Sequence, residues 1–267
     1  MEFVPDVALA RVNSLYYGGF HTYSRAYICT NEDLRNSMKY VPKNCNRALV
    51  AAASGDHPLF CSLYGAKDVD TFDISYNAKC IMDIKTAAMR YLGYSDYLDL
   101  LRNLCYTKDI KNVEDMDVVS ENLSQIEYNY LCAMQGHRLF SHGNWYGEDN
   151  DGALKKKEYE KLQKVIKKPY NFILTDIDDL STHLTGKYDF MHFSNIFDYA
   201  DETSDQFDII FPMLNYVNVG GRIVIQHLCD LPWTKNPFLD IDGGKEAFEN
   251  WTFFKKKGDV SIFERVR

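Results

Sequence analysis

Long hydrophobic runs are missing from this sequence. No apolar stretch reaches the ~20 residues that a membrane-spanning helix needs, so we expect no transmembrane segment. An excess of basic residues is missing too. The formal net charge is −8, which disfavours a broad, positively charged surface that would bind nucleic acid. The seven cysteines lack the pair spacing of a metal site and no signal peptide is present. We therefore expect reduced thiols, no bound metal and a cytoplasmic location.

The segment where a nucleotide-binding loop is expected contains few glycines. Residues 47–73 contain an apolar run at 48–53, the turn Ser54-Gly55-Asp56, a short helical pattern and a second strand that ends at Asp73. A dinucleotide fingerprint has three glycines at such a turn, and a triphosphatase loop has a lysine followed by serine or threonine. This turn has neither, which argues against NAD, FAD and nucleoside triphosphates.

What remains in this stretch suits a nucleoside ligand without phosphates. Gly55 lets the backbone approach a ligand closely, and the helix that follows presents unpaired N–H groups. Asp73 lies where a carboxylate can accept both ribose hydroxyls. S-adenosylmethionine is the common cofactor of this kind, and the alternative is an ordinary doubly wound domain whose turn binds nothing.

The rest of the chain alternates strands and helices. A long helix is predicted to end before Gly93, and further strands are predicted at residues 172–176, 188–195 and 222–228, the last directly after Gly220-Gly221. Residues 251–264 have the pattern of a hairpin. Five parallel strands followed by an antiparallel hairpin form the sheet plan of class I S-adenosylmethionine-dependent transferases. We therefore predict an α/β, Rossmann-like, doubly wound fold.

Three parts are predicted along the chain. Residues 1–45 form an N-terminal helical arm, residues 46–93 and 169–267 a cofactor-binding domain, and residues 94–168 a helical insertion placed to act as an acceptor-binding lid. Tyrosines gather outside the predicted strands, where they either line a pocket for an amphipathic or cationic ligand or form core with a polar tip. Residues 155–168 are predicted to form a lysine-rich helix. Its lysines either form a solvated face or bind an anionic headgroup or partner.

Several motifs resemble a known family. Residues 52–56, 65–75 and 83–88 occur in the order and at the spacing found in the S-adenosylmethionine:diacylglycerol 3-amino-3-carboxypropyltransferase family of betaine-lipid synthesis. Residues 193–199, Phe-Ser-Asn-Ile-Phe-Asp-Tyr, are similar to its serine-asparagine-phenylalanine-glutamate-tyrosine segment. Residues 31–33, Asn-Glu-Asp, resemble its tryptophan-glutamate-aspartate element without the tryptophan. Asp56-His57 stands where the family has an extra glycine or asparagine.

The resemblance implies which part of the cofactor each motif residue faces. The implied contacts are Ser54 and Gly55 with the methionine moiety, Asp73 with the ribose, Ile74 and Asp176 with the adenine region, and Ser194 and Asn195 with the reacting end. The predicted cofactor site also includes three residues at or just after the carboxyl ends of predicted strands: Asp56, Asn77 and Ile177.

Acid–base candidates also lie at or near the carboxyl ends of strands. The predicted catalytic residues are Asn195, His57, Asp198 and Tyr199. Asp198 could instead cap the helix that follows it. His192 is either a core histidine on its strand or a residue of the site.

The favoured activity is transfer of the 3-amino-3-carboxypropyl group to an unknown small-molecule or lipid-like acceptor, with peripheral membrane contact left open and no nucleic-acid partner. Methyl transfer to a small molecule is the alternative. A second alternative is a non-catalytic binding protein, because alanines 51–53 replace the acid expected at the end of the first strand. The sequence makes no prediction about the oligomeric state.

Overall fold

The computed structural model describes residues 25–106, 112–133, 139–141, 154–199, 202–227, 235–256 and 260–267. The chain divides into two compact units, which are described separately below. Unit 1 comprises residues 1–31, 52–59 and 73–174, and unit 2 comprises residues 32–51, 60–72 and 175–267. Parts of the predicted arm (1–24) and of the predicted insertion (107–111, 134–138 and 142–153) lie outside the described residues.

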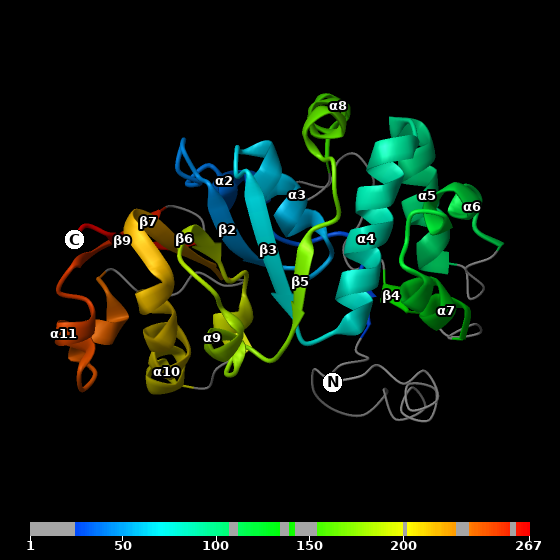
Figure 1. Cartoon of the computed structure of the whole chain (residues 1–267). Coiled ribbons are helices and arrows are strands. Elements are labelled where there is room, and N and C mark those ends of the chain that lie inside the picture. The colour runs from blue at the N-terminus through cyan, green and yellow to red at the C-terminus, as the bar shows by residue number, and fades with distance from the viewer. Residues whose placement is uncertain are drawn as a thin grey trace. The chain divides into compact units, whose positions relative to one another are not determined.

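A seven-stranded sheet has the order β5-β3-β2-β6-β7-β9-β8 (Figure 1). β2 pairs in parallel with β3 and β6, β6 pairs in parallel with β7, and β9 is antiparallel to both β7 and β8. The predicted plan of parallel strands closed by a C-terminal hairpin is therefore confirmed. The strands are β2 (Arg47–Ala51), β3 (Asp68–Asp73), β5 (Asn171–Leu174), β6 (Tyr188–His192), β7 (Val217–Gln226), β8 (Trp251–Lys256) and β9 (Val260–Arg265).

β2 is the strand that the apolar run at 48–53 predicted. Ala48, Leu49 and Val50 are completely buried. Leu49 lies opposite Asp70 of β3 on one side and opposite Met191 of β6 on the other. A central parallel strand is covered on both faces, which explains why its sequence is continuously apolar instead of alternating.

The helices divide between the units. Unit 2 contains α2 (Leu34–Met38), α9 (Leu180–His183), α10 (Thr203–Met213) and α11 (Gly244–Ala247), with the 3-10 helices η3 (Ile196–Tyr199), η4 (Leu214–Tyr216) and η5 (Pro237–Asp240). Unit 1 contains α4 (Tyr76–Tyr91), α5 (Tyr94–Tyr106), α6 (Met116–Ser120), α7 (Gln125–Ala133) and α8 (Lys156–Val165). The residues of α3 (Asp56–Leu63) are shared between the two units.

Helix α4 organises unit 1. The side chain of Ser75 accepts a hydrogen bond from the backbone N–H of Asn77 at 3.2 Å and so caps the helix. The buried Tyr159 of α8 donates to the carbonyl oxygen of Leu92 at 2.9 Å, and the buried Tyr130 of α7 donates to the side chain of Asn77 at 2.8 Å. These tyrosines are core residues with hydrogen-bonded hydroxyls, and they attach α7 and α8 to α4.

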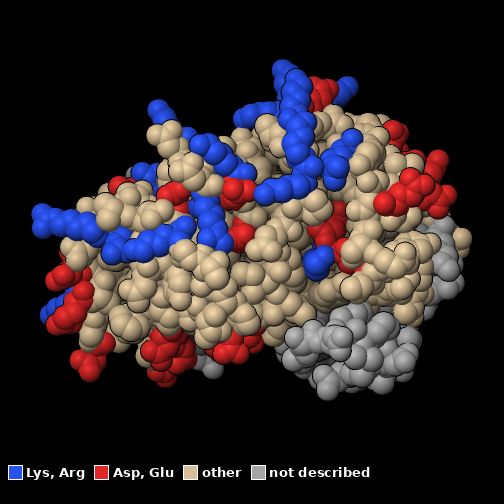
Figure 2. Space-filling view, in the orientation of Figure 1, with Lys and Arg blue, Asp and Glu red and all other residues tan. Residues whose placement is uncertain are grey.

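Helix α8 separates its apolar and basic residues. Tyr159 and Leu162 are buried, whereas the lysines of residues 155–168 are exposed. Figure 2 shows blue lysine side chains projecting where α8 lies in Figure 1. The basic run is therefore the outer face of an amphipathic helix.

Two features of the sheet regions differ from the sequence predictions. A two-residue parallel pair joins β1 (Ala26–Tyr27) to β4 (Phe140–Ser141), in segments that were expected to be helical. β7 begins at Val217 and not at Arg222 as predicted, so Gly220 and Gly221 lie inside the strand and do not precede it. Gly220 has a φ of +79°, and a Cβ atom on Gly221 would lie 2.7 Å from Val217 Cγ1. The glycines thus mark an irregular part of the strand, next to a register shift in its pairing with β6.

Among the described residues, no helix combines the length and the hydropathy needed to span a bilayer.

Candidate functional site

The predicted cofactor turn is a tight turn packed against α4. Gly55 has a φ of +80°, and its N–H donates to the carbonyl oxygen of Ala52 at 2.6 Å. A Cβ atom at position 55 would lie 2.8 Å from Met82 Cα. Both the backbone conformation and the close approach of α4 therefore require glycine here. Ala53 also has a positive φ, +46°, although it has a side chain.

Asp73 holds this turn from the end of β3. Its Oδ2 accepts from the N–H of Ala53 at 2.9 Å, and its Oδ1 accepts from the N–H of Ser75 at 2.8 Å. Burial raises the pKa of Asp73 to about 6, and the two backbone hydrogen bonds oppose the rise. The carboxylate predicted to accept the ribose hydroxyls is thus fixed in position by backbone groups.

A buried ion pair supports the turn from the other side. Asp56 Oδ1 accepts from Lys85 Nζ at 2.5 Å, and Asp56 Oδ2 accepts from the N–H of Thr30 and from Ser54 Oγ, each at 2.8 Å. The Lys85 side chain is completely buried. Protein groups thus engage both oxygens of Asp56, and its contact with a cofactor stays a prediction.

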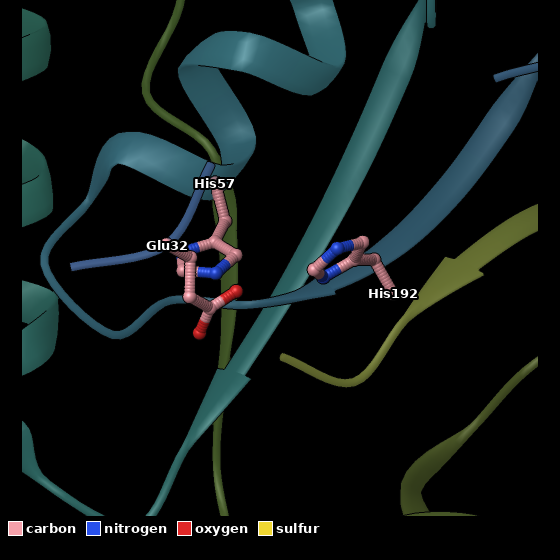
Figure 3. A group of neighbouring side chains, drawn as sticks. All are labelled: Glu32, His57 and His192. Carbon is pink, nitrogen blue, oxygen red and sulfur yellow. The ribbon is translucent and has the colours of Figure 1, made fainter. Parts of the chain in front are cut away.

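The remaining predicted site residues of unit 1 lie directly after β3 or in the first turns of α3 and α4. Ile74 follows β3 directly and is half-buried. Asn77 is buried in the first turn of α4, where its Oδ1 accepts from Tyr130. His57 is buried in the first turn of α3 (Figure 3).

In unit 2, Ser194 lies directly after β6 in a strained conformation. Its φ is +54°, which costs ~1–2 kcal/mol for a residue with a side chain. Its N–H donates to His192 Nδ1 at 3.1 Å, and its hydroxyl donates to the buried carboxylate of Glu32. Figure 3 draws Glu32, from the segment before α2, and His192, at the end of β6. Strain of this kind persists where the surroundings fix the conformation, and it often marks a functional position.

The predicted catalytic residues after Ser194 have different surroundings. The half-buried Asn195 has its Oδ1 3.2 Å from Ser194 Oγ. Asp198 lies in η3, and its Oδ1 is 2.8 Å from Nδ1 of the buried His227. Tyr199, at the end of η3, is 57% exposed.

Asp176 and Ile177 follow β5 in an acidic loop. Asp176 is exposed and Ile177 is half-buried. The side-chain hydroxyl of Thr175 donates to the carbonyl oxygen of Asp176 at 3.0 Å. Burial, together with the negative charges of Asp176 and Asp179, raises the pKa of Asp178.

Three residues that contact predicted site residues in the structure were not predicted from the sequence as site residues. Lys85 was recognised only as part of a motif, although a lysine at helical spacing from Ile81 and Ala88 on an apolar stripe indicates a buried partner. Glu32 carried no local indication beyond the resemblance, since its contact with Ser194 spans 162 positions. His227 lies beyond the last residue of β7 and likewise had no recognisable pattern.

Comparison with known proteins gives structural likenesses only. No family model matches the sequence, and no curated protein does. The rRNA methyltransferase aviRa from Streptomyces viridochromogenes is 12% identical, with a TM-score of 0.45, over 99% of this chain and 94% of that one. The N-methyltransferase NodS from Bradyrhizobium japonicum WM9, in complex with S-adenosyl-L-homocysteine, is 10% identical, with a TM-score of 0.41, over 88% and 84%. Likenesses this weak say nothing about activity, and the fold is assigned from the strand order.

Proposed function

We propose that this chain is an S-adenosylmethionine-dependent transferase. The observation that carries the proposal is the geometry around Asp73, a carboxylate held by the N–H groups of Ala53 and Ser75 at the carboxyl end of a strand. Val50 of β2 lies opposite His192 of β6 in a parallel pair, so these two strands end at the same edge of the sheet. That edge is where open parallel sheets bind their ligands.

The donor and acceptor groups of the turn fit the cofactor. The Asp73 carboxylate accepts from the N–H groups of Ala53 and Ser75, and a carboxylate has about four lone-pair positions, so it is proposed to accept the ribose hydroxyls as well. Ile74 supplies an apolar surface next to this acid, as an adenine ring requires. The turn Ser54-Gly55-Asp56 contains no lysine and a single glycine, which agrees with a cofactor that lacks a phosphate.

We favour transfer of the 3-amino-3-carboxypropyl group. When bound, S-adenosylmethionine supplies an electrophilic carbon next to a sulfonium: the acceptor atom forms a bond to that carbon, the carbon–sulfur bond breaks, and its electron pair stays on sulfur in methylthioadenosine. The acceptor's proton passes to a base. This choice is supported by the resemblance of the sequence motifs, two of which are in contact through Glu32 and Ser194.

The chain's own residues position the reactants and remove a proton. Asn195 is proposed to orient the reacting end, and Asp198, oriented by its contact with His227, is the proposed base, together with His57 and Tyr199 as further candidates. The proposed acceptor is a small molecule or a lipid-like molecule, with residues 94–168 as its lid.

Methyl transfer is the alternative, and the identity of the product separates the two reactions. The purified chain would be incubated with S-adenosylmethionine and, in parallel, with a lipid extract and an extract of polar metabolites. Methylthioadenosine is expected from aminocarboxypropyl transfer and S-adenosylhomocysteine from methyl transfer. Cofactor binding with neither product in any fraction would favour the non-catalytic reading that the alanines at 51–53 suggest.

A further inference from the structure

Helices α4 and α7 of unit 1 meet at a cluster of three charged side chains: Lys79 and Asp83 of α4 and Glu127 of α7. Lys79 Nζ donates to Asp83 Oδ2 at 2.6 Å and to Glu127 Oε1 at 2.5 Å. The side chains of Asp83 and Glu127 are only 9% and 5% exposed. Two buried acids therefore contact the same ammonium, and its single positive charge balances only one carboxylate.

The other oxygens of the two acids have different surroundings. Glu127 Oε2 accepts from the backbone N–H of Ser124 at 3.0 Å and from the Ser124 hydroxyl at 2.6 Å. Asp83 Oδ1 is buried and has no hydrogen-bond donor in the part of the chain that the structure describes. A buried oxygen without a donor costs less in a neutral acid than in a carboxylate. Asp83 is therefore the acid of this pair that we expect to hold a proton.

The pKa values of the two acids agree with these contacts. Burial raises the pKa of Asp83 to about 8, and a hydrogen bond with Glu127 adds to the rise. Burial acts in the same direction on Glu127, but the hydrogen bond with Asp83 and the charge of Lys79 lower the pKa of Glu127 to about 2. At neutral pH the pair therefore holds one proton, which lies on the Asp83 side.

The remaining titratable groups that interact with Asp83 are on α4. They are Tyr76 and Cys80, and burial raises the pKa of both, so both are neutral over the same pH range. No charged group of α5, α6 or α8, in the described part of unit 1, interacts with Asp83. The net charge of the cluster is thus set by Lys79, Asp83 and Glu127.

We propose that the proton of Asp83 holds α7 on α4, and that α7 is released from α4 as the pH rises. With the proton present, Asp83 donates to Glu127 and the three side chains have no net charge. Once this proton has passed to water, two carboxylates repel each other in a buried site with one ammonium. The inference does not depend on the proposed function, although α7 belongs to the proposed lid.

Proton linkage gives the direction and the size of the effect. Docked α7 holds one proton more than released α7, because the acids regain ordinary pKa values of about 4 when they are exposed to water. The equilibrium constant for release should therefore rise about tenfold per pH unit between about pH 5 and pH 8, and it should be constant above about pH 8.

Hydrogen–deuterium exchange of the α7 amides, corrected for the intrinsic pH dependence of exchange, measures this equilibrium constant. The unaltered chain would be compared with Asp83→Asn and Glu127→Gln. The amide of Asp83→Asn donates to Glu127 as the protonated acid does but does not titrate, so α7 should stay docked with no dependence on pH. Glu127→Gln leaves one acid with one ammonium, so the dependence on pH should be lost there too.

Asp99→Asn is the matched control in the same unit. Asp99 of α5 forms an ion pair with Arg102, but the two side chains are 51% and 53% exposed. An exposed pair has little influence on stability or on the pKa of its members. We expect α7 in this variant to show the same dependence on pH as α7 in the unaltered chain.

Two results of the exchange experiment would overturn the inference. One is release of α7 in the unaltered chain that does not increase with pH, and the other is an Asp83→Asn variant that keeps the full increase. The chemical shift of the Asp83 carboxyl carbon, measured in the unaltered chain, tests the proton without any variant. We expect this shift to titrate near pH 8. A titration at about pH 4, the ordinary value for an aspartate, would contradict the inference.

Discussion

At the scale of single residues, Asp73 is the side chain on which the account depends. Its carboxyl group is fixed by two backbone N–H groups, and burial raises its pKa to about 6. The carboxylate is the form that accepts from both ribose hydroxyls. Cofactor affinity and the ionisation of Asp73 are therefore linked.

This linkage predicts the pH dependence of cofactor binding. Affinity for S-adenosylmethionine should be constant above about pH 7 and should fall as the pH drops through about 6, because protonation removes the double acceptor. Calorimetry from pH 5 to 8, in steps on the order of half a unit, would measure it. In Asp73→Asn we expect affinity weaker by ~1–3 kcal/mol at pH 8 and no inflection near pH 6. An inflection that persists in the variant would assign the titration to another group.

The same shift affects stability with the opposite sign. Because the pKa of Asp73 in the folded protein lies above the ordinary value of 3.8, the contribution of Asp73 to stability is fully present below about pH 3.8 and is lost as the pH rises through about 6. The ionised form of Asp73 therefore lowers the stability of the folded protein. Ionisable groups with strongly shifted pKa values occur often at functional positions.

At the scale of elements, the Asp56–Lys85 pair links the start of α3 to the middle of α4. Lys85 is the one cation that the structure places on the Asp56 carboxylate within the described part of unit 1. Removing one partner of a buried pair leaves an uncompensated charge, which costs more than removing both.

Lys85→Met should therefore lower the free energy of unfolding by ~3–5 kcal/mol, measured by urea denaturation. The double variant Asp56→Asn, Lys85→Met should recover most of that loss. Lys157→Met, at an exposed position of α8, is the control and should change stability by less than ~0.5 kcal/mol. A double variant no more stable than Lys85→Met would show that the pair does not act as a buried ion pair.

The elements that sequence could predict have a local pattern. The apolar run of β2, the single glycine at 55 and the period of α4 are all readable over a few residues, and each prediction is confirmed within a few residues. β1 and β4 have two residues each and pair over more than a hundred positions, so no periodicity precedes them. The start of β7 was predicted at Arg222, after Gly220 and Gly221, because paired glycines more often mark the boundary of a strand than its interior.

At the scale of the whole molecule, the plan of the sheet could be predicted and the partners of buried polar groups could not. Parallel strands closed by an antiparallel hairpin follow from alternating strands and helices with a final hairpin, because few topologies satisfy those connections. Glu32 contacts Ser194, and Asp198 contacts His227, through the folded arrangement of distant segments. The fold is therefore more predictable from this sequence than its chemistry.

The central claim is that this chain binds S-adenosylmethionine through the turn after β2 and the acid at the end of β3. The most direct measurement is a calorimetric titration of the folded protein with S-adenosylmethionine, accompanied by its melting temperature with and without ligand. We predict saturable binding at one site per chain and a melting temperature that rises with ligand concentration. No heat of binding and no change in melting temperature at millimolar ligand would contradict the claim.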